Sequence, residues 1–282
     1  ILNAANAVIT KNESRKEKNL WSDAGSGAPL TGYVAESEYD EAEFIKSEIR
    51  SLQDLGHSNP GDTAVLYRTN AQSRIFEEIF MRAAIPYKVV GGLRFYERKE
   101  VKDLLAYLRV LANPDDEVSL RRIINFPKRG IGDASETQIA SYAERNGLSV
   151  RQVLEHVGDL GFGPKITGAI TQLADLLNEL EAMIETQPVD FILRAVLERT
   201  GYLESLRASR DPQDEARVEN LEELVSVARE FNRNNPEGRL PDFLNEVALV
   251  AAAVAGSAGT TPPRWRNTRG VTPVRRRKKR MK

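Results

Sequence analysis

The sequence predicts an α/β segment followed by an all-α segment, with the division at the glycine pair Gly91 and Gly92. Between Thr31 and Val90, short apolar runs alternate with amphipathic stretches of helical period. From about Arg98 onward only the helical period remains. Strands separated by amphipathic helices predict a mostly parallel sheet covered by helices, and an uninterrupted helical period predicts a helical bundle.

The α/β segment is expected to run in the order β-α-β-α-β. The predicted strands are the apolar runs GYVA (32–35), TAVLYR (63–68) and YKVV (87–90), and the predicted helices cover 36–55 and 71–84. Loops that follow the carboxyl ends of parallel strands are common ligand-binding positions. The loop after TAVLYR is therefore the first candidate site.

The all-α segment contains seven stretches with apolar residues at helical spacing. They cover residues 100–113, 119–125, 134–147, 165–184, 190–199, 215–233 and 242–250. Asp133, three residues before Glu136, predicts a capping-box-like start for one helix, and Gly147 predicts its end. No period of 20 to 50 residues recurs, so a solenoid is not expected.

Composition excludes several classes of function. The chain has 41% apolar and 29% charged residues, as in a soluble globular protein, and has no apolar run long enough to span a bilayer. It has no cysteine, which excludes disulfides and thiolate chemistry. The two histidines, His57 and His156, are far apart, and the region from Gly27 to Gly32 lacks the lysine of a phosphate-binding P-loop. We expect no catalytic residue, metal site or cofactor site in this chain.

Residues 251–282 differ from the rest of the chain. They contain ten Lys/Arg and no acid, which leaves 30 basic and 41 acidic residues before them. Their low apolar content predicts a disordered basic tail. Such a tail could bind nucleic acid, act as a localisation signal, or be an artefact of a shifted reading frame. The opening run ILNAANAVI has helical spacing with no cap before it, so we expect a piece of a longer chain.

The segment FPKRGIGDAS (126–135) is the most informative short motif. Gly130 and Gly132 permit a tight turn with exposed amides, Ile131 can anchor that turn, and a helix follows. Lys128 and Arg129 add positive charge, so a phosphate could bind here without any reading of base sequence. The alternative is an ordinary glycine-rich connector between helices.

Two further segments suggest contact with a nucleic acid. In YRTNAQSR (67–74), Asn70 and Arg74 follow a predicted strand, but Asn70 could simply cap a helix and Arg74 could pair with a nearby glutamate. In GGLRFYERKEVKDLLAYLR (91–109), basic residues alternate with Phe95 and Tyr96, a pattern that suits a single strand, although Phe95 is equally suited to a core. Residues 63–132 hold thirteen basic and eight acidic residues.

Four segments, in this order, resemble the C-terminal half of UvrD/PcrA-type superfamily 1 DNA helicases. They are AVLYRTNAQSR, IPYKVVGGLRFYERKEVKDLLAYLRVLANPDD, INFPKRGIG and RVENLEELV, and the resemblance extends from Ile1 to about Val250. It implies part of an ATP-dependent 3′-to-5′ helicase of DNA repair or replication, cytoplasmic and nucleoid-associated, with ATP and Mg²⁺ bound in the full-length parent.

The resemblance also implies a division of the chain. Residues 1–93 would form part of a RecA-like motor subdomain (2A), and 94–250 a helical subdomain (2B) that contacts duplex DNA through a helix-hairpin-helix-like GIG turn. Residues 251–282 would be the tail. The implied DNA-binding residues are Asn70, Arg74, Arg98, Lys128, Arg129, Gly130, Ile131 and Gly132.

The family's P-loop, its magnesium-binding acids and the TLHxAKGLEF-type motif expected after Val250 are absent from this sequence. We therefore expect sequence-independent binding at single-strand/duplex junctions, and no ATP hydrolysis by this chain alone. Two alternatives remain. One is a protein-interaction and autoinhibitory module for repair proteins or RNA polymerase, favoured by acidic helices from Thr171 to Phe231. The other is a truncated, inactive gene product. No membrane partner is expected.

Overall fold

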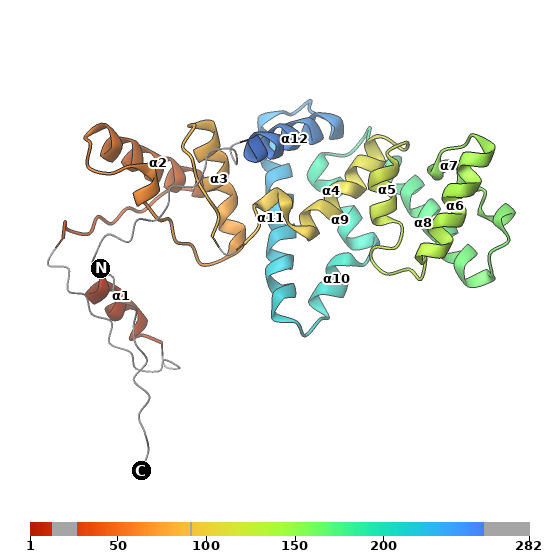
Figure 1. Ribbon diagram of the computed structural model, residues 1–282, viewed down its shortest axis with the longest axis horizontal. Coiled ribbons are helices and arrows are strands. Elements are labelled where there is room, and N and C mark those ends of the chain that lie inside the picture. The colour runs from red at the N-terminus through yellow and green to blue at the C-terminus, as the bar shows by residue number, and fades with distance from the viewer. Residues whose placement is uncertain (13–26, 91, 257–282) are drawn as a thin grey trace, which may run out of the picture.

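The computed structural model describes residues 1–12, 27–90 and 92–256, and the elements it contains in these ranges are helices (Figure 1). The α-helices are α1 (Leu2–Ile9), α2 (Glu38–Asp54), α3 (Ser73–Arg82), α4 (Lys99–Ala112), α5 (Glu117–Ile123), α6 (Asp133–Asn146), α7 (Val150–Glu155), α8 (Pro164–Glu181), α9 (Val189–Arg199), α10 (Tyr202–Arg207), α11 (Pro212–Asn234) and α12 (Leu240–Gly256). Short 3-10 helices are η1 (Pro60–Asp62), η2 (Asn70–Gln72), η3 (Phe95–Glu97) and η4 (Val157–Leu160).

Helix α4 is the centre of the larger hydrophobic core. Its sequence places apolar residues on nearly every face, and Val101, Leu104, Tyr107 and Leu108 are completely buried. Helices α5, α8, α9, α11 and α12 pack directly against it (Figure 1). The neighbouring helices cover its apolar residues, while Lys99, Lys102 and Arg109 remain exposed.

A smaller core joins α2 to α3. Ala42 and Ile49 of α2 pack with Ile75 and Ile79 of α3 and with Ile85 beyond it. Helix α3 also contacts α12, and the adjoining η2 contacts α11. Along the chain, the last buried residue of the smaller core is Ile85 and the first buried residue of the larger core is Phe95. The predicted boundary at 93 lies between them. The division into two subdomains at that boundary stays a prediction.

The fold-class prediction is wrong for the first segment, because the described residues contain no strand and hence no RecA-like parallel sheet. The runs 32–35, 63–68 and 87–90 are irregular, although helices α2 and α3 lie between them as expected. A short apolar run can form an extended strand, but a strand also needs a hydrogen-bonded neighbour. None is present among the described residues, and Leu66 and Val90 are 90% and 82% exposed.

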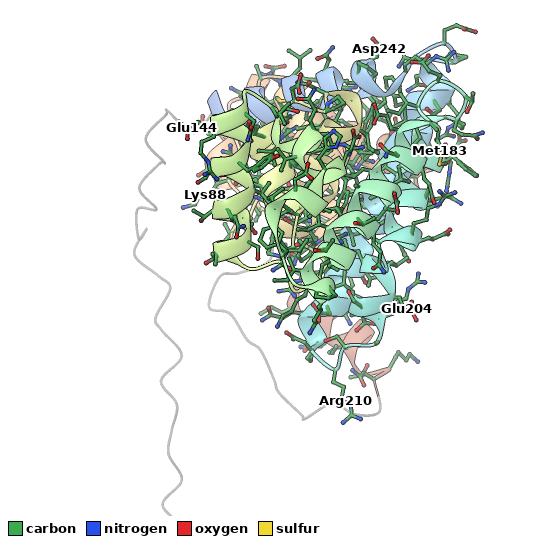
Figure 2. All side chains as sticks on the ribbon, turned by 90° about the vertical axis from the view of Figure 1, so that its right-hand side faces the viewer. Lys88, Glu144, Met183, Glu204, Arg210 and Asp242 are labelled. Carbon is green, nitrogen blue, oxygen red and sulfur yellow. The ribbon has the colours of Figure 1, made fainter. Side chains whose placement is uncertain are left out.

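Most helices after Arg98 fall close to the segments that the helical period predicts, whereas α7 and α10 lie outside those segments. Gly147 ends α6 in the left-handed conformation, at φ 64°, as expected of a C-terminal glycine. The predicted start of α6 is off by one residue, because Gly132 and not Asp133 is the N-cap. Figure 2 shows labelled charged side chains at the ends of this helical part, such as Glu144, Arg210 and Asp242, pointing away from its body.

Helix α12 continues to Gly256, so the first six residues of the predicted tail are helical rather than disordered. The prediction for the remaining residues, 257–282, lies outside the described part of the chain. Helix α1 forms from the opening run and buries no residue. Within the described ranges, none of the helices has the length and apolar character needed to cross a membrane.

Candidate nucleic-acid interface

The GIG motif lies in the turn between α5 and α6. Ile131 is completely buried in the larger core, so it fixes the turn to the body of the protein. Gly130 and Gly132 are exposed on either side of it. Gly130 has φ +83°, a conformation that favours glycine, whereas Gly132 has φ −92° and ψ 171°, which any residue adopts. Only the first glycine is thus required by the backbone itself.

The backbone amides of this turn form two groups, one that donates to an acceptor inside the protein and one that does not. Asn125 Oδ1 accepts hydrogen bonds from the backbone N–H groups of Arg129, Gly130 and Ile131, at 2.9, 3.1 and 3.2 Å. The expected exposed amides at Gly130 and Ile131 are therefore already satisfied. The next amides, at residues 132–134, have no acceptor within the described residues. They form the N-terminus of α6, where backbone N–H groups and the helix dipole favour an anion.

The two basic residues of the motif have different environments. Lys128 is exposed. Arg129 is half-buried, and its Nη1 donates to the carbonyls of Ile123 and Phe126 at 2.8 and 2.9 Å, while its Nη2 donates to Tyr107 Oη at 2.5 Å. The guanidinium is therefore used inside the protein, and Lys128 is the member of the pair whose charge reaches solvent.

Other charged side chains surround the same helix terminus. Burial and the carboxylate of Asp133 raise the pKa of Glu136, and the positive charge of Arg121 opposes that shift. Arg121 is 57% exposed and its contact with Glu117 is a loose 3.8 Å. The terminus therefore carries two acids of its own, with Lys128 and Arg121 as the nearby solvent-facing cations.

Asn70 lies at the start of η2, well before the GIG turn in the sequence. It is exposed, and its side chain makes no hydrogen bond within the described residues. Gln72 accepts from the N–H groups of Arg68 and Thr69 at 2.9 and 3.0 Å, so the capping role that Asn70 could have had belongs to Gln72. The Asn70 amide group is free to bind a ligand.

Arg74 is enclosed by carboxylates. Its side chain is 1% exposed and contacts Glu78 at 3.1 Å and Glu38 at 3.2 Å, with a further ion pair to Glu223 of α11. Burial lowers the pKa of Arg74, but the charges of Glu78 and Glu223 outweigh it and the net shift is upward. DNA could reach this guanidinium only if these ion pairs opened. In the structure Arg74 is therefore paired with glutamates, which is the alternative to DNA contact that its sequence also allowed.

Arg98 is also an internal connector. It is 7% exposed, and it donates to Asn220 Oδ1 at 2.6 Å, to the Asn70 carbonyl at 2.9 Å and to Ser73 Oγ at 2.9 Å. Burial lowers its pKa from the ordinary value. Arg98 therefore ties the η2 loop that carries Asn70 to helix α11, and supports that loop from behind.

The aromatic residues proposed as stacking platforms are buried. Phe95 is 1% exposed, and Tyr96 is 9% exposed with its hydroxyl donating to Glu78 at 3.1 Å. The structure thus brings the GIG residues and Lys128 to one surface, leaves Asn70 on another loop, and uses Arg74, Arg98 and Arg129 internally. The sequence interpretation missed Asn125, Tyr107 and Arg121. Asparagine five residues before a glycine is too weak a signal to have found the first.

The chain matches a known protein family over more than half of its length. A model of the UvrD-like helicase C-terminal domain matches residues 1–160. This chain belongs to that family. Residues 124–132 of the GIG turn fall within the match.

Curated relatives agree with the family. The chain is 48% identical over 271 residues to "ATP-dependent DNA helicase UvrD1" of Mycobacterium tuberculosis H37Rv, which covers 90% of this chain and 35% of the relative. It is 49% identical over 274 residues to the UvrD1 of Mycobacterium leprae, and 40% identical over 251 residues to "ATP-dependent DNA helicase PcrA" of Bacillus subtilis. In both, 89% of this chain is covered. The chain spans about a third of the length of these relatives.

Proposed function

We propose that this chain is the DNA-engaging part of an ATP-dependent 3′-to-5′ DNA helicase, and that it binds duplex DNA through the backbone of the α5–α6 turn. The observation that supports this most is Gly132. It has an ordinary backbone conformation, and a Cβ added there would meet no atom within 4 Å. The backbone at this position is therefore open to close approach by a phosphate, beside amides that have no acceptor among the described residues.

The phosphate would be bound by the unpaired amides of residues 132–134, with Lys128 and Arg121 supplying positive charge. Contacts of this kind involve no base edge, so they do not select a DNA sequence. With two cations, the logarithm of affinity should fall with the logarithm of salt with a slope of only about 2. Asn70 would contact the single strand next to the duplex, so the preferred ligand is a duplex with a single-stranded tail.

ATP and Mg²⁺, which the resemblance assigns to the full-length parent, have no matching residues here. No P-loop occurs in the sequence, and no group of three His, Asp or Glu side chains in the described residues is placed to hold a metal. The proposal therefore contains no step through either group. It places ATP hydrolysis in the longer protein, in the bacterial cytoplasm with the nucleoid DNA.

A matched pair of serine variants tests the proposal. Gly132 caps α6 and Gly163 caps α8, both are exposed, and both have open space at Cβ. Serine is a good N-cap, so neither Gly132→Ser nor Gly163→Ser should lower stability. A fluorescently labelled tailed duplex is titrated at low salt. Gly132→Ser should bind about tenfold more weakly, because the serine hydroxyl accepts from an amide of the first turn of α6 that would otherwise donate to the phosphate. Gly163→Ser should bind like the unmodified chain. Equal binding by all three would reject the proposal.

A second candidate function is protein binding. The helices α8 and α11 carry several exposed acids, including Glu179 and Glu222, whose side chains are 64% and 57% exposed. Such surfaces suit basic patches on repair proteins or on RNA polymerase. Binding of purified RNA polymerase that survives Gly132→Ser and is lost on charge reversal at Glu179 would favour this function.

A further inference from the structure

We propose that Asn125 is a positioning residue for DNA binding, because it sets the backbone of the α5–α6 turn in the conformation that presents the amides of residues 132–134. This inference rests on the proposed function. It concerns a residue that makes no contact with the DNA itself, and it reassigns Arg129 from a DNA contact to a part of the same internal support.

The first support is the geometry at Asn125. One side-chain oxygen accepts from three consecutive amides, those of residues 129–131, with distances between 2.9 and 3.2 Å. Three successive N–H groups converge on one acceptor only when the backbone curves around it. This curvature includes the positive φ of Gly130. Asn125 therefore occupies the inside of the turn and determines its shape.

The second support is that the carbonyls of the same segment are held by Arg129. Its Nη1 lies 2.8 Å from the carbonyl oxygen of Ile123 and 3.4 Å from that of Ile124, at the end of α5, where helical carbonyls lack partners in the helix. The Phe126 carbonyl accepts from Arg129 and from the hydroxyl of Tyr107, which belongs to the buried helix α4. The turn is thus fixed at its amides by Asn125 and at its carbonyls by Arg129 and α4.

The consequence for binding is that the turn is rigid before DNA arrives. A preformed site loses less conformational entropy on binding than a mobile one, so affinity depends on this internal network as well as on surface charge. The Asn125 side chain is uncharged. Its effect on affinity should therefore be the same at every salt concentration, unlike the effect of Lys128, whose charge releases counterions when it meets a phosphate.

The experiment titrates the tailed duplex with the full chain across a series of KCl concentrations. Asn125→Ala should bind about tenfold more weakly at every concentration, with an unchanged salt slope. Lys128→Ala should bind more weakly at low salt, with a slope smaller by about 1. Asn125→Asp keeps an oxygen acceptor of the same length, so at high salt, where its added negative charge is screened, it should bind more tightly than Asn125→Ala.

Amide hydrogen exchange provides the readout of the turn itself. The amides of residues 129–131 should be protected in the unmodified chain and in Asn125→Asp, and should exchange rapidly in Asn125→Ala while the α4 amides stay protected. If Asn125→Ala unfolds, Arg129→Lys, which loosens the carbonyl side of the same network without removing charge, should weaken binding at every KCl concentration with an unchanged salt slope.

The outcomes separate this inference from the proposed function. If Lys128→Ala and Gly132→Ser weaken binding but Asn125→Ala does not, the positioning role is wrong and the proposed function stands. An altered salt slope in Asn125→Ala would also overturn the positioning role, because it would show an effect through charge. If none of the variants changes binding, the proposed function itself fails.

Discussion

Replacing Arg74 by methionine tests whether the α2–α3 pair is held to the larger core by a buried ion-pair cluster. The guanidinium is 1% exposed and meets Glu38, Glu78 and Glu223, which come from three different helices. Removal of one partner from a buried pair leaves the opposite charges without compensation, at a cost of about 3 to 5 kcal/mol. We expect Arg74→Met to lose that much free energy of unfolding at neutral pH.

The pKa of the acid partner Glu223 predicts how the loss of unfolding free energy in Arg74→Met depends on pH. Burial raises the pKa of Glu223 above its ordinary value even though Arg74 opposes the shift. Without Arg74 that pKa rises further, so the folded variant takes up a proton that the unfolded chain does not hold. A raised folded pKa stabilises the protein below the unfolded pKa, and the benefit disappears as pH rises through the folded value. The deficit of Arg74→Met should therefore shrink as pH falls.

Arg207→Met is the matched control. Arg207 contacts Glu222 at 2.9 Å, but the two side chains are 59% and 57% exposed. An exposed pair of this kind contributes about 1 kcal/mol or less. Urea unfolding, followed by circular dichroism at several pH values, measures both variants. Losses of equal size, or a deficit in Arg74→Met that does not change with pH, would refute the assigned role of the cluster. Glu223→Gln added to Arg74→Met should recover part of the loss.

Three further changes follow from individual residues. Gly130→Ala places a Cβ at φ +83°. It should cost about 1 kcal/mol in urea unfolding, because no steric contact adds to the backbone strain. Burial raises the pKa of Glu77, against the hydrogen bond from a nearby serine. The permanently neutral Glu77→Gln should therefore gain stability relative to the unmodified chain as pH rises from 4 to 8, and a constant difference would contradict this. Asn220 bridges Arg98 and Glu100 at 2.6 Å each, so Asn220→Ala should cost about 1 to 3 kcal/mol, and a thermal melt unchanged from the unmodified chain would contradict it.

The helices could be predicted from the sequence because their signal is local. In α4 the apolar residues and the helical period occupy the same fourteen residues, and the end of α6 at Gly147 depends on one glycine conformation. The strands could not be predicted in the same way. TAVLYR and YKVV have the spacing of strands, but a strand exists only when another segment pairs with it, and that partner is not a property of the run itself.

The site shows the same difference between local and distant information. The GIG turn could be found because two glycines around an apolar residue restrict the backbone directly. Arg74 and Arg98 could not be assigned from their neighbours, since the residues that bind them, Glu223 and Asn220, lie more than a hundred positions further along the chain. An arginine at a loop-to-helix junction is equally suited to a phosphate and to a carboxylate until the fold supplies one of them.

The α5–α6 turn has few charges that face solvent. Residues 63–132 hold thirteen basic and eight acidic residues, yet several of their arginines are bound inside the protein. Arg74 meets carboxylates, while Arg98 and Arg129 meet amide, hydroxyl and carbonyl oxygens. The solvent-facing charge beside the α6 terminus is consequently small, and the acids Asp133 and Glu136 oppose it further. The proposed function therefore predicts that the backbone of the turn, fixed by Asn125, determines affinity for DNA more than surface charge does.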